Sequence, residues 1–156
     1  MGVMVNEMGL EEDIKQTKAF KSQRHKALVN IIYTQAWLRD KLGTSLKPFG
    51  LTNQQYNVLR ILRGSSPKPL STSCIRSRML DKMSDVSRIV DRLHKKGWVS
   101  KVVCAGDKRK VDIVISEEGL QVLDKIDVEN EMEDVFSNLT EQDAEQLNQI
   151  LDKVRD

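Results

Sequence analysis

The sequence has little of several features that would place it in common protein classes. No run of about 18 apolar residues occurs, so no membrane-spanning helix is predicted. The segment MGVMVNEMGL lacks a basic stretch followed by a long apolar one, so we expect no secretory signal. Only two cysteines occur, Cys74 and Cys104, which indicates no disulfide framework and suits a reducing cytoplasm. We therefore expect a cytoplasmic protein without a membrane partner.

Residues and motifs for metal binding and catalysis are also scarce. The two histidines, His25 and His94, and the two cysteines do not pair at the short spacings of a zinc site. No nucleophile elbow, phosphate-binding loop or H-E-x-x-H motif is present, and neither histidine lies near a distinctive serine motif. We expect no metal, no cofactor and no enzymatic activity.

Charged residues, in contrast, are abundant and segregated along the chain. The stretch from Arg60 to Lys110 holds 14 Lys or Arg and 4 Asp, a net charge of +10. The remainder holds 11 basic and 19 acidic residues, a net charge of −8. This separation indicates that the middle of the chain binds a polyanion, while the flanking parts have another role.

Helix-capping signals divide the basic middle into short helices. Thr52, with a glutamine three residues later, forms a capping box that starts a helix, and Gly64 is expected to end it as the residue after the cap. Ser71 is expected to cap the helix TSCIRSRML. Ser84 is expected to cap a further helix in SDVSRIVDRLHKKGWV, which ends at Gly97. Two short helices separated by a few residues predict a helix-turn-helix motif.

The second of these helices has two different faces. Its apolar residues recur at the spacing of one buried helical face: Val86, Ile89, Val90 and Leu93. The opposite face is mainly polar and basic, with two acidic residues: Ser84, Ser87, Arg88, Arg92, Lys95, Lys96, Asp85 and Asp91. The pattern predicts a helix that is buried on one side and presents positive charge on the other.

A β-hairpin is predicted directly after this helix. The segments WVSKVVC and KVDIVIS are rich in β-branched residues, and the residues between them, AGDKR, include the Gly and Asp of a turn. A helix-turn-helix followed by a hairpin is a winged helix, here with a basic hairpin tip. The predicted fold class is mainly α, with a winged helix-turn-helix, a small β-hairpin wing and flanking dimerisation helices.

The flanking segments are predicted to be long helices. After an N-terminal tail of residues 1–10, helical periodicity covers about 11–42, and the winged-helix core covers about 52–116. Ser116 is expected to cap a helix that reaches about Phe136, and Thr140 caps the last one. Because residues about 11–42 and 117–154 carry more apolar surface than a winged helix needs, we assign them to dimerisation within one domain, 11–156.

Three motifs in this order resemble the MarR family of bacterial transcription regulators. They are LSTSCIRSRML, MSDVSRIVDRLHKKGWV and DKRKVDIVISEEG, the last with Asp107, Arg109, Ile113, Ile115, Ser116 and Gly119 at the spacing typical of the family. The resemblance implies a homodimer that binds a palindromic operator in double-stranded DNA, usually as a repressor of nearby genes. It also implies release by a small ligand or by oxidation, and we expect a small aromatic or phenolic effector.

The winged-helix geometry assigns roles to individual residues. The start of the recognition helix meets base edges in the major groove, and the residues expected there are Ser84, Asp85, Ser87 and Arg88, with Arg92 one turn later. In the wing, Arg109 is expected in the minor groove, Lys108 at the DNA backbone, and Asp107 as the residue that orients Arg109.

Several alternatives stay open from the sequence. The basic face of a winged helix is also compatible with a protein-interaction module that docks an acidic partner. Cys74 is expected to be a small buried residue, whereas Cys104 is either a plain surface residue or the basis of a thiol sensor. The aromatic side chains of Tyr33, Trp37 and Phe49 either line an effector pocket or belong to the core.

Overall fold

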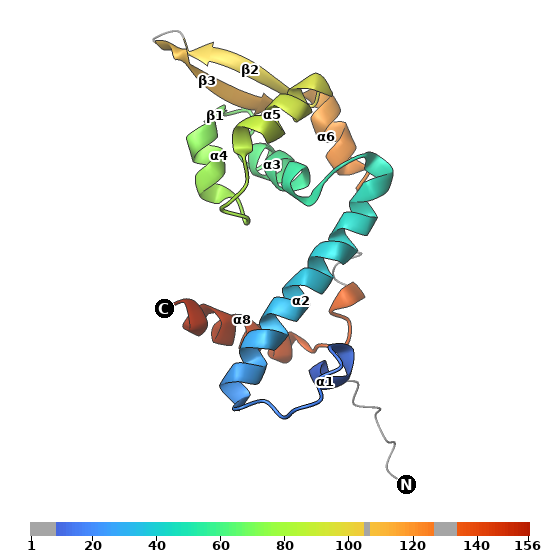
Figure 1. The fold of residues 1–156 in the computed structure, drawn as a ribbon. Helices are drawn as coiled ribbons and strands as arrows, with labels where there is room; N and C mark the ends of the chain where they lie inside the picture. Colours follow the sequence, from blue (N-terminus) through green and yellow to red (C-terminus); the bar gives the residue numbers. More distant parts are fainter. Residues whose placement is uncertain (1–8, 105–106, 127–133) are drawn as a thin grey trace. The chain divides into compact units, whose positions relative to one another are not determined.

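The computed structural model describes residues 9–104, 107–126 and 134–156, and for residues 104 and 107–110 it describes the backbone only (Figure 1). The chain divides into two units, Met1–Lys41 and Leu42–Asp156. The described elements, in chain order, are α1 (Leu10–Asp13), α2 (Gln23–Leu46), the 3-10 helix η1 (Lys47–Phe49), α3 (Asn53–Arg63), β1 (Leu70–Ser71), α4 (Thr72–Arg78), α5 (Val86–Lys95), β2 (Val99–Cys104), β3 (Asp107–Ile115), α6 (Glu117–Asp124) and α8 (Glu141–Arg155).

The predicted helix over 11–42 is two helices, so that prediction is wrong in detail. Helix α1 ends at Asp13, and Lys15 adopts the left-handed backbone conformation (φ 52°), which a continuous helix excludes. Helix α2 then starts afresh, because the Ser22 hydroxyl accepts the His25 N–H at 3.1 Å in N-cap geometry. The predicted tail also ends earlier than expected, since Leu10 is already helical and buried.

Helix α2 continues to Leu46, beyond the predicted end near residue 42. Pro48 follows two residues later in η1, where its ring prevents the α-helix from continuing. Gly50 then turns the chain with a left-handed φ of 65°. The last turn of α2 joins the core of the second unit, because Leu46 is completely buried there.

The helix-turn-helix is formed by α4 and α5, packed on α3. The Thr52 capping box and the Ser71 cap are confirmed, with the Cys74 N–H donating to the Ser71 hydroxyl at 3.2 Å. Gly64 ends α3, but it is the C-cap itself, with a right-handed φ of −65°, so its prediction as the residue after the cap is wrong. Gly97 does have that role after α5, with φ 76°.

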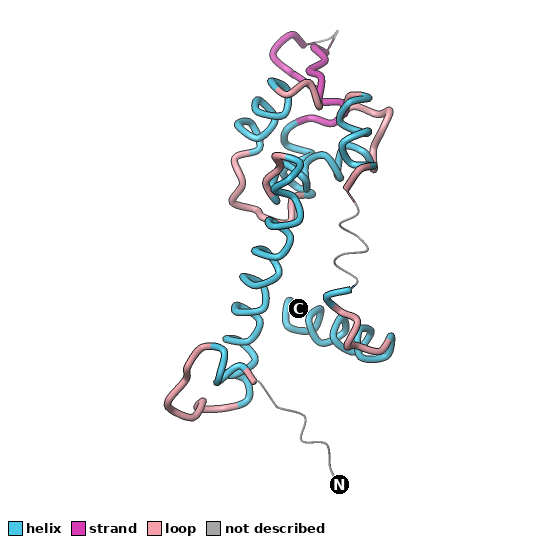
Figure 2. The backbone as a smooth tube through the Cα atoms, turned by 90° about the vertical axis from the view of Figure 1, so that its right-hand side faces the viewer, coloured by secondary structure: helices cyan, strands magenta, loops and turns pink. Residues whose placement is uncertain are grey.

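Three strands, drawn in magenta in Figure 2, form one antiparallel sheet, and their order is β1-β3-β2. The predicted hairpin is confirmed, with Val99 opposite Ile115, and β1 adds a short third strand by pairing Leu70 with Ile113. Strand β3 starts at Asp107, so the D-K-R segment continues the strand and does not belong to the turn as predicted. The rest of the predicted turn, residues 105–106, lies outside the described residues.

One apolar core lies between α3, the recognition helix and the sheet. The predicted inner face of α5 is confirmed, because Val86, Val90 and Leu93 are at most 2% exposed and Ile89 is partly buried. They pack in one cluster with residues from the other elements, among them Val58, Leu59, Leu62, Ile75, Met79, Val99, Ile113, Ile115 and Leu123. This burial fixes which side of α5 faces outward.

The C-terminal helical prediction is partly wrong. Ser116 caps α6 as predicted, but α6 ends at Asp124 and does not reach Phe136, because the chain leaves the helix and buries Ile126 in the core. Residues 127–133 lie outside the described part. Thr140 caps α8 as predicted, through a capping box with Asp143. No helix among the described residues combines the length and apolar character that crossing a membrane requires.

Candidate nucleic-acid interface

The N-terminus of α5 is capped by Asp85, so the prediction of Ser84 as the cap is wrong. An Asp85 carboxylate oxygen accepts the Arg88 backbone N–H at 3.2 Å. With the cap at this position, Val86 is the first helical residue and its side chain is completely buried. The Ser84 hydroxyl lies in the interior, and no hydrogen-bond partner for it is found among the described residues.

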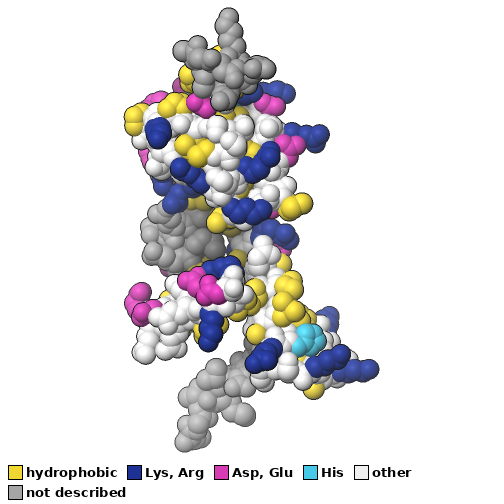
Figure 3. Space-filling view, turned by 90° about the vertical axis from the view of Figure 1, so that its left-hand side faces the viewer, with side chains coloured by type: hydrophobic (Ala, Val, Ile, Leu, Met, Phe, Trp, Pro, Cys, Tyr) yellow, Lys and Arg dark blue, Asp and Glu magenta, His cyan; other side chains and the backbone are white. Residues whose placement is uncertain are grey.

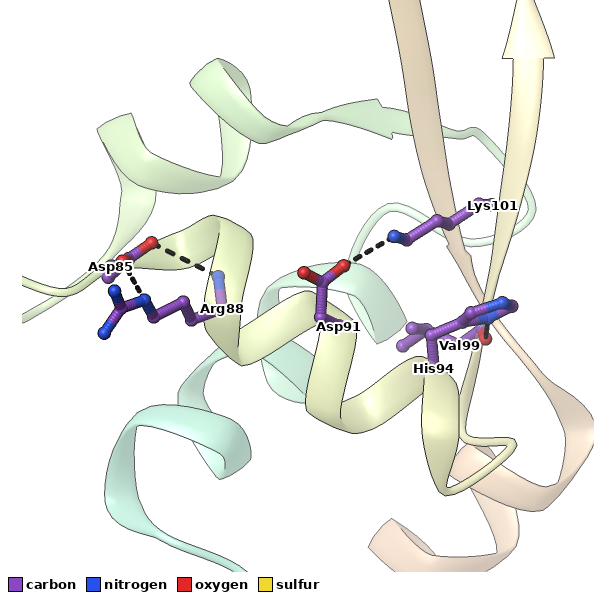
Figure 4. A network of polar contacts seen from close by, with 6 residues as sticks. All are labelled: Asp85, Arg88, Asp91, His94, Val99 and Lys101. Carbon is purple, nitrogen blue, oxygen red and sulfur yellow. Dashed lines mark hydrogen bonds and ion pairs between the residues drawn. The ribbon is translucent and has the colours of Figure 1, made fainter.

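Arg88 projects from the same helix end and is held by the same carboxylate. Its Nε lies 3.2 Å from the second Asp85 carboxylate oxygen, and its side chain is 81% exposed (Figure 4). Because the ion pair uses Nε, the terminal amino groups of the guanidinium are presented outward. Asp85 therefore both starts the helix and restricts the orientation of Arg88.

The remaining recognition-helix residues of the prediction lie on the outer face. Ser87 and Arg92 are exposed, and Arg92 stands one turn beyond Arg88 at the i,i+4 spacing. The structure thus brings Asp85, Ser87, Arg88 and Arg92 to one side of α5, opposite the buried apolar stripe. Ser84 is the one member of the predicted set whose side-chain oxygen is buried.

Helix α5 is tied to the wing by two polar contacts that sequence reasoning missed. Lys101 of β2 donates to the Asp91 carboxylate at 2.6 Å, and the His94 Nδ1 lies 3.0 Å from the Val99 carbonyl oxygen (Figure 4). The hydrogen bond and the charge of Lys101 lower the pKa of Asp91. No sequence signal joins Asp91 and Lys101, since their pairing depends on how the hairpin folds back beside the helix.

The turn between α4 and α5 exposes two large apolar side chains, which sequence reasoning also missed. Leu80 is 88% exposed and Met83 is 92% exposed. The predicted helix TSCIRSRML includes Leu80, but α4 ends at Arg78 because Met79 adopts an extended conformation (ψ 138°). Apolar residues in a sequence are ordinarily assigned to the core, so no pattern indicated this exposure.

Basic side chains surround this turn. Arg78 donates to the Ser65 hydroxyl at 2.8 Å, and the Lys82 ammonium donates to the Ser77 carbonyl oxygen at 2.7 Å. Lys and Arg side chains are spread over the surface of the winged-helix unit in Figure 3. The backbone of Asp107, Lys108 and Arg109 lies in β3, and their side chains are outside the described part of the structure.

The other candidate residues do not gather into a second site among the side chains that the structure describes. Cys74 is a free thiol that is partly, not fully, buried, and Cys104 is outside the described side chains. Tyr33 and Trp37 are 36% and 42% exposed, whereas Phe49 packs against the core. Within the part of the chain that the structure describes, no three His, Cys, Asp or Glu side chains gather as a metal site would require.

Fold and surface together define a winged helix-turn-helix protein whose recognition helix presents a polar, basic face. A profile described as MarR family matches residues 49–110, which contain this motif. This match, together with similar proteins that are named as regulators, supports a winged-helix transcription regulator of the MarR type, as the sequence motifs indicated.

Three known proteins illustrate the similarity. The regulator PecS of Dickeya dadantii is 29% identical over 119 residues, which cover 74% of this chain and 69% of PecS. The transcriptional repressor MprA of Escherichia coli is 22% identical over 151 residues, 90% of this chain and 86% of MprA. A mutant MarR of E. coli, solved with operator DNA, has the same fold, with a TM-score of 0.71, 22% identity and coverage of 94% of this chain and 98% of that one.

Proposed function

We propose that this regulator acts as a homodimeric repressor that binds a palindromic operator in double-stranded DNA. The observation that carries the proposal is α5, where a buried apolar stripe directs Arg88 outward with 81% of its side chain exposed. A helix with this arrangement fits the major groove, whose width admits one helix with its N-terminal residues against base edges. MprA and the operator-bound MarR support the repressor and operator parts of the proposal.

Arg88 is the proposed base-reading residue. A guanidinium donates two hydrogen bonds to the O6 and N7 atoms of guanine, a contact worth about 1–3 kcal/mol of discrimination. The outward terminal amino groups of Arg88 are suited to that contact, since Asp85 already occupies Nε. Ser87 and Arg92 extend the same surface, whereas the buried hydroxyl of Ser84 makes it a poor base contact.

The proposal assigns the wing to the DNA backbone and the minor groove. Lys108 would neutralise phosphate, and Arg109 would enter the narrow minor groove of A·T-rich DNA, where the negative potential is strongest. Asp107 would orient Arg109 without contacting DNA, because phosphate repels a carboxylate. These three roles rest on the sequence pattern and on the position of the residues in β3.

The proposal also includes a second copy of the chain and an effector. Apolar side chains on α2 and α8 are uncovered in the single chain, among them Ile32 at 60% and Ile150 at 61% exposed, which supports a dimer interface there. A small aromatic or phenolic effector would contact the half-exposed rings of Tyr33 and Trp37. A regulator of transcription acts where the bacterial genome lies, so the proposed location is the cytoplasm.

A winged helix that docks an acidic protein is the alternative, and DNA titration separates the two. The wild type is expected to prefer its operator over a scrambled duplex, and Arg88→Ala to lose that preference while most phosphate affinity remains. Lys108→Ala is expected to weaken both duplexes alike and to reduce the salt slope by about one unit. Absence of duplex binding at low salt would support the alternative.

A further inference from the structure

The turn between α4 and α5 has a fixed conformation that holds Leu80 and Met83 away from the core. Met79 anchors its start with only 1% exposure, and the Leu80 N–H donates to the Asn57 side-chain oxygen of α3 at 3.0 Å. The Met83 N–H donates to the Asp81 carboxylate at 3.0 Å. Both apolar side chains are therefore displayed by a hydrogen-bonded turn, at 88% and 92% exposure.

The charges along this segment identify what such a surface would bind. From Arg76 to Arg88 it carries four basic and two acidic residues. Asp85 is paired with Arg88, which leaves Asp81 as the one further acid against Arg76, Arg78 and Lys82 in this segment. The positive side chains thus dominate the surroundings of Leu80 and Met83, which favours a polyanion that also offers apolar groups.

Duplex DNA offers such groups in the major groove. Thymine is the base that presents a methyl group at its major-groove edge, and apolar side chains distinguish it by contact with that methyl. Met83 lies two residues before the cap of α5, and the N-terminal end of a recognition helix is the part closest to the bases. Its flexible thioether side chain adapts to such an edge without a fixed shape.

We propose that Leu80 and Met83 form a thymine-reading surface, which contacts thymine methyl groups beside the bases reached by Arg88. This inference rests on the proposed function and extends it from a polar contact to an apolar one. It assigns part of the sequence preference to the turn before the recognition helix, and it predicts a thymine next to the guanine in each half-site.

Replacing thymine with deoxyuridine tests the inference, because that change removes only the methyl group. A pool of duplexes of about 30 base pairs with randomised centres, long enough for two half-sites, is first enriched with the wild-type protein. Each thymine of the enriched site is then replaced in turn. The wild type is expected to bind about fourfold more weakly at a contacted position, the factor for one buried methyl-sized group.

Variants at the turn complete the test. Met83→Ala, or Leu80→Ala with Met83→Ala, is expected to bind the thymine and deoxyuridine duplexes equally, whereas Met83→Leu keeps the difference. Because both side chains are almost fully exposed, thermal unfolding of the variants is expected to match the wild type.

Two results would overturn the inference, and they are distinguishable. If the wild type enriches no sequence, the proposed function fails and the thymine contact fails with it. If a site is enriched but deoxyuridine never changes wild-type binding, or the double alanine variant keeps the wild-type ratio, only the thymine-reading surface is wrong.

Discussion

At the scale of single residues, Asp85 combines two functions that a neutral cap would not. One carboxylate oxygen accepts a backbone N–H at the helix start, and the other pairs with the Arg88 side chain. The pair is exposed, so its contribution to the free energy of unfolding is small. Its importance lies in limiting the directions in which the Arg88 guanidinium points.

Asparagine and alanine at position 85 separate these functions. Asp85→Asn keeps an oxygen for the cap, so its stability is expected to stay close to that of the wild type, whereas Asp85→Ala loses about 1 kcal/mol. Both variants are expected to bind scrambled DNA more tightly, because a negative charge is removed, and to discriminate less against it. Denaturant unfolding and paired duplex titrations measure the two effects. Unchanged discrimination in both variants would exclude a positioning role for Asp85.

Gly119 is required by close packing. A Cβ atom at this position would lie 2.3 Å from the Trp98 carbonyl oxygen and 2.9 Å from a side-chain carbon of Ile115. The Trp98 carbonyl cannot move away easily, since it accepts the Ser116 N–H at 3.0 Å. The glycine therefore allows the first turn of α6 to lie against the chain that enters β2.

Gly119→Ala is expected to lower the free energy of unfolding by about 1–3 kcal/mol, because it overpacks this junction. Gly64→Ala is the matched control, since its Cβ would meet the nearest atom, the Arg60 carbonyl oxygen, at an ordinary 3.5 Å. With a right-handed φ of −65°, the control is expected to be neutral or to stabilise by up to about 1 kcal/mol. Chemical denaturation of both variants checks the difference, and equal stabilities would contradict the packing role.

At the scale of elements, the ion pair between Asp91 and Lys101 joins the recognition helix to the wing. The pKa of Asp91 is lowered by Lys101 in the folded protein, relative to an ordinary value of 3.8. A carboxyl with a lowered pKa contributes stability above its unfolded value and loses that contribution as the pH falls through its folded value. The ion pair between α5 and β2 is therefore expected to weaken only in acid.

The Lys101→Met variant tests this ion pair through the pH dependence of its stability. The variant is expected to be less stable than the wild type near neutral pH, with the difference disappearing at pH values below the folded pKa of Asp91. Asp91→Asn should show the same convergence. Unfolding followed from neutral to acidic pH gives the difference, and NMR titration of Asp91 gives the pKa directly. If the stability difference between variant and wild type persists in strong acid, the effect comes from packing of the aliphatic part of the Lys101 side chain and not from the ion pair.

The starts and ends of the helices illustrate what could and could not be predicted from the sequence. Caps at Thr52, Ser71, Ser116 and Thr140 are local hydrogen bonds, and all four are found where the sequence places them. The end of α6 was not predicted because apolar spacing continues across it, and the break between α1 and α2 was not predicted because residues 15–27 contain no glycine or proline that would mark it. A periodic pattern does not reveal where a chain leaves a helix to bury a residue such as Ile126.

The candidate nucleic-acid interface was likewise predictable only in part. The buried and exposed faces of α5 were predictable, because helical periodicity determines them. The change of cap from Ser84 to Asp85 depends on which of two adjacent acceptors reaches the helix, and both satisfy the same sequence rule. Exposure of Leu80 and Met83, and the contact of Asp91 with Lys101, arise from tertiary structure and have no local signal.

At the scale of the whole molecule, uncovered apolar side chains are concentrated on helices outside the winged-helix core. Those on α2 include Leu28, Ile31, Ile32 and Trp37, and those on α8 include Leu147, Ile150 and Val154, each between 39% and 67% exposed. Apolar side chains exposed along α2 are visible in Figure 3. Because these residues recur along helices and are not scattered singly, their exposure indicates surfaces that a second copy covers.

A negative charge introduced on α2 or α8 by substitution is expected to prevent dimerisation. The wild type should sediment as a dimer at micromolar concentration, whereas Ile32→Glu and Ile150→Glu should shift it toward the 17.8 kDa monomer. Burying an unpaired carboxylate disfavours association, by about tenfold or more in the dissociation constant.

Val103→Glu is the control, since Val103 is 57% exposed on β2, outside α2 and α8, and this variant should remain dimeric. A monomeric wild type would contradict the dimer, whereas loss of the dimer only with Val103→Glu would place the interface elsewhere. Because a palindromic operator requires two recognition helices in fixed register, the monomeric variants are also expected to lose operator preference even though Arg88 is unchanged.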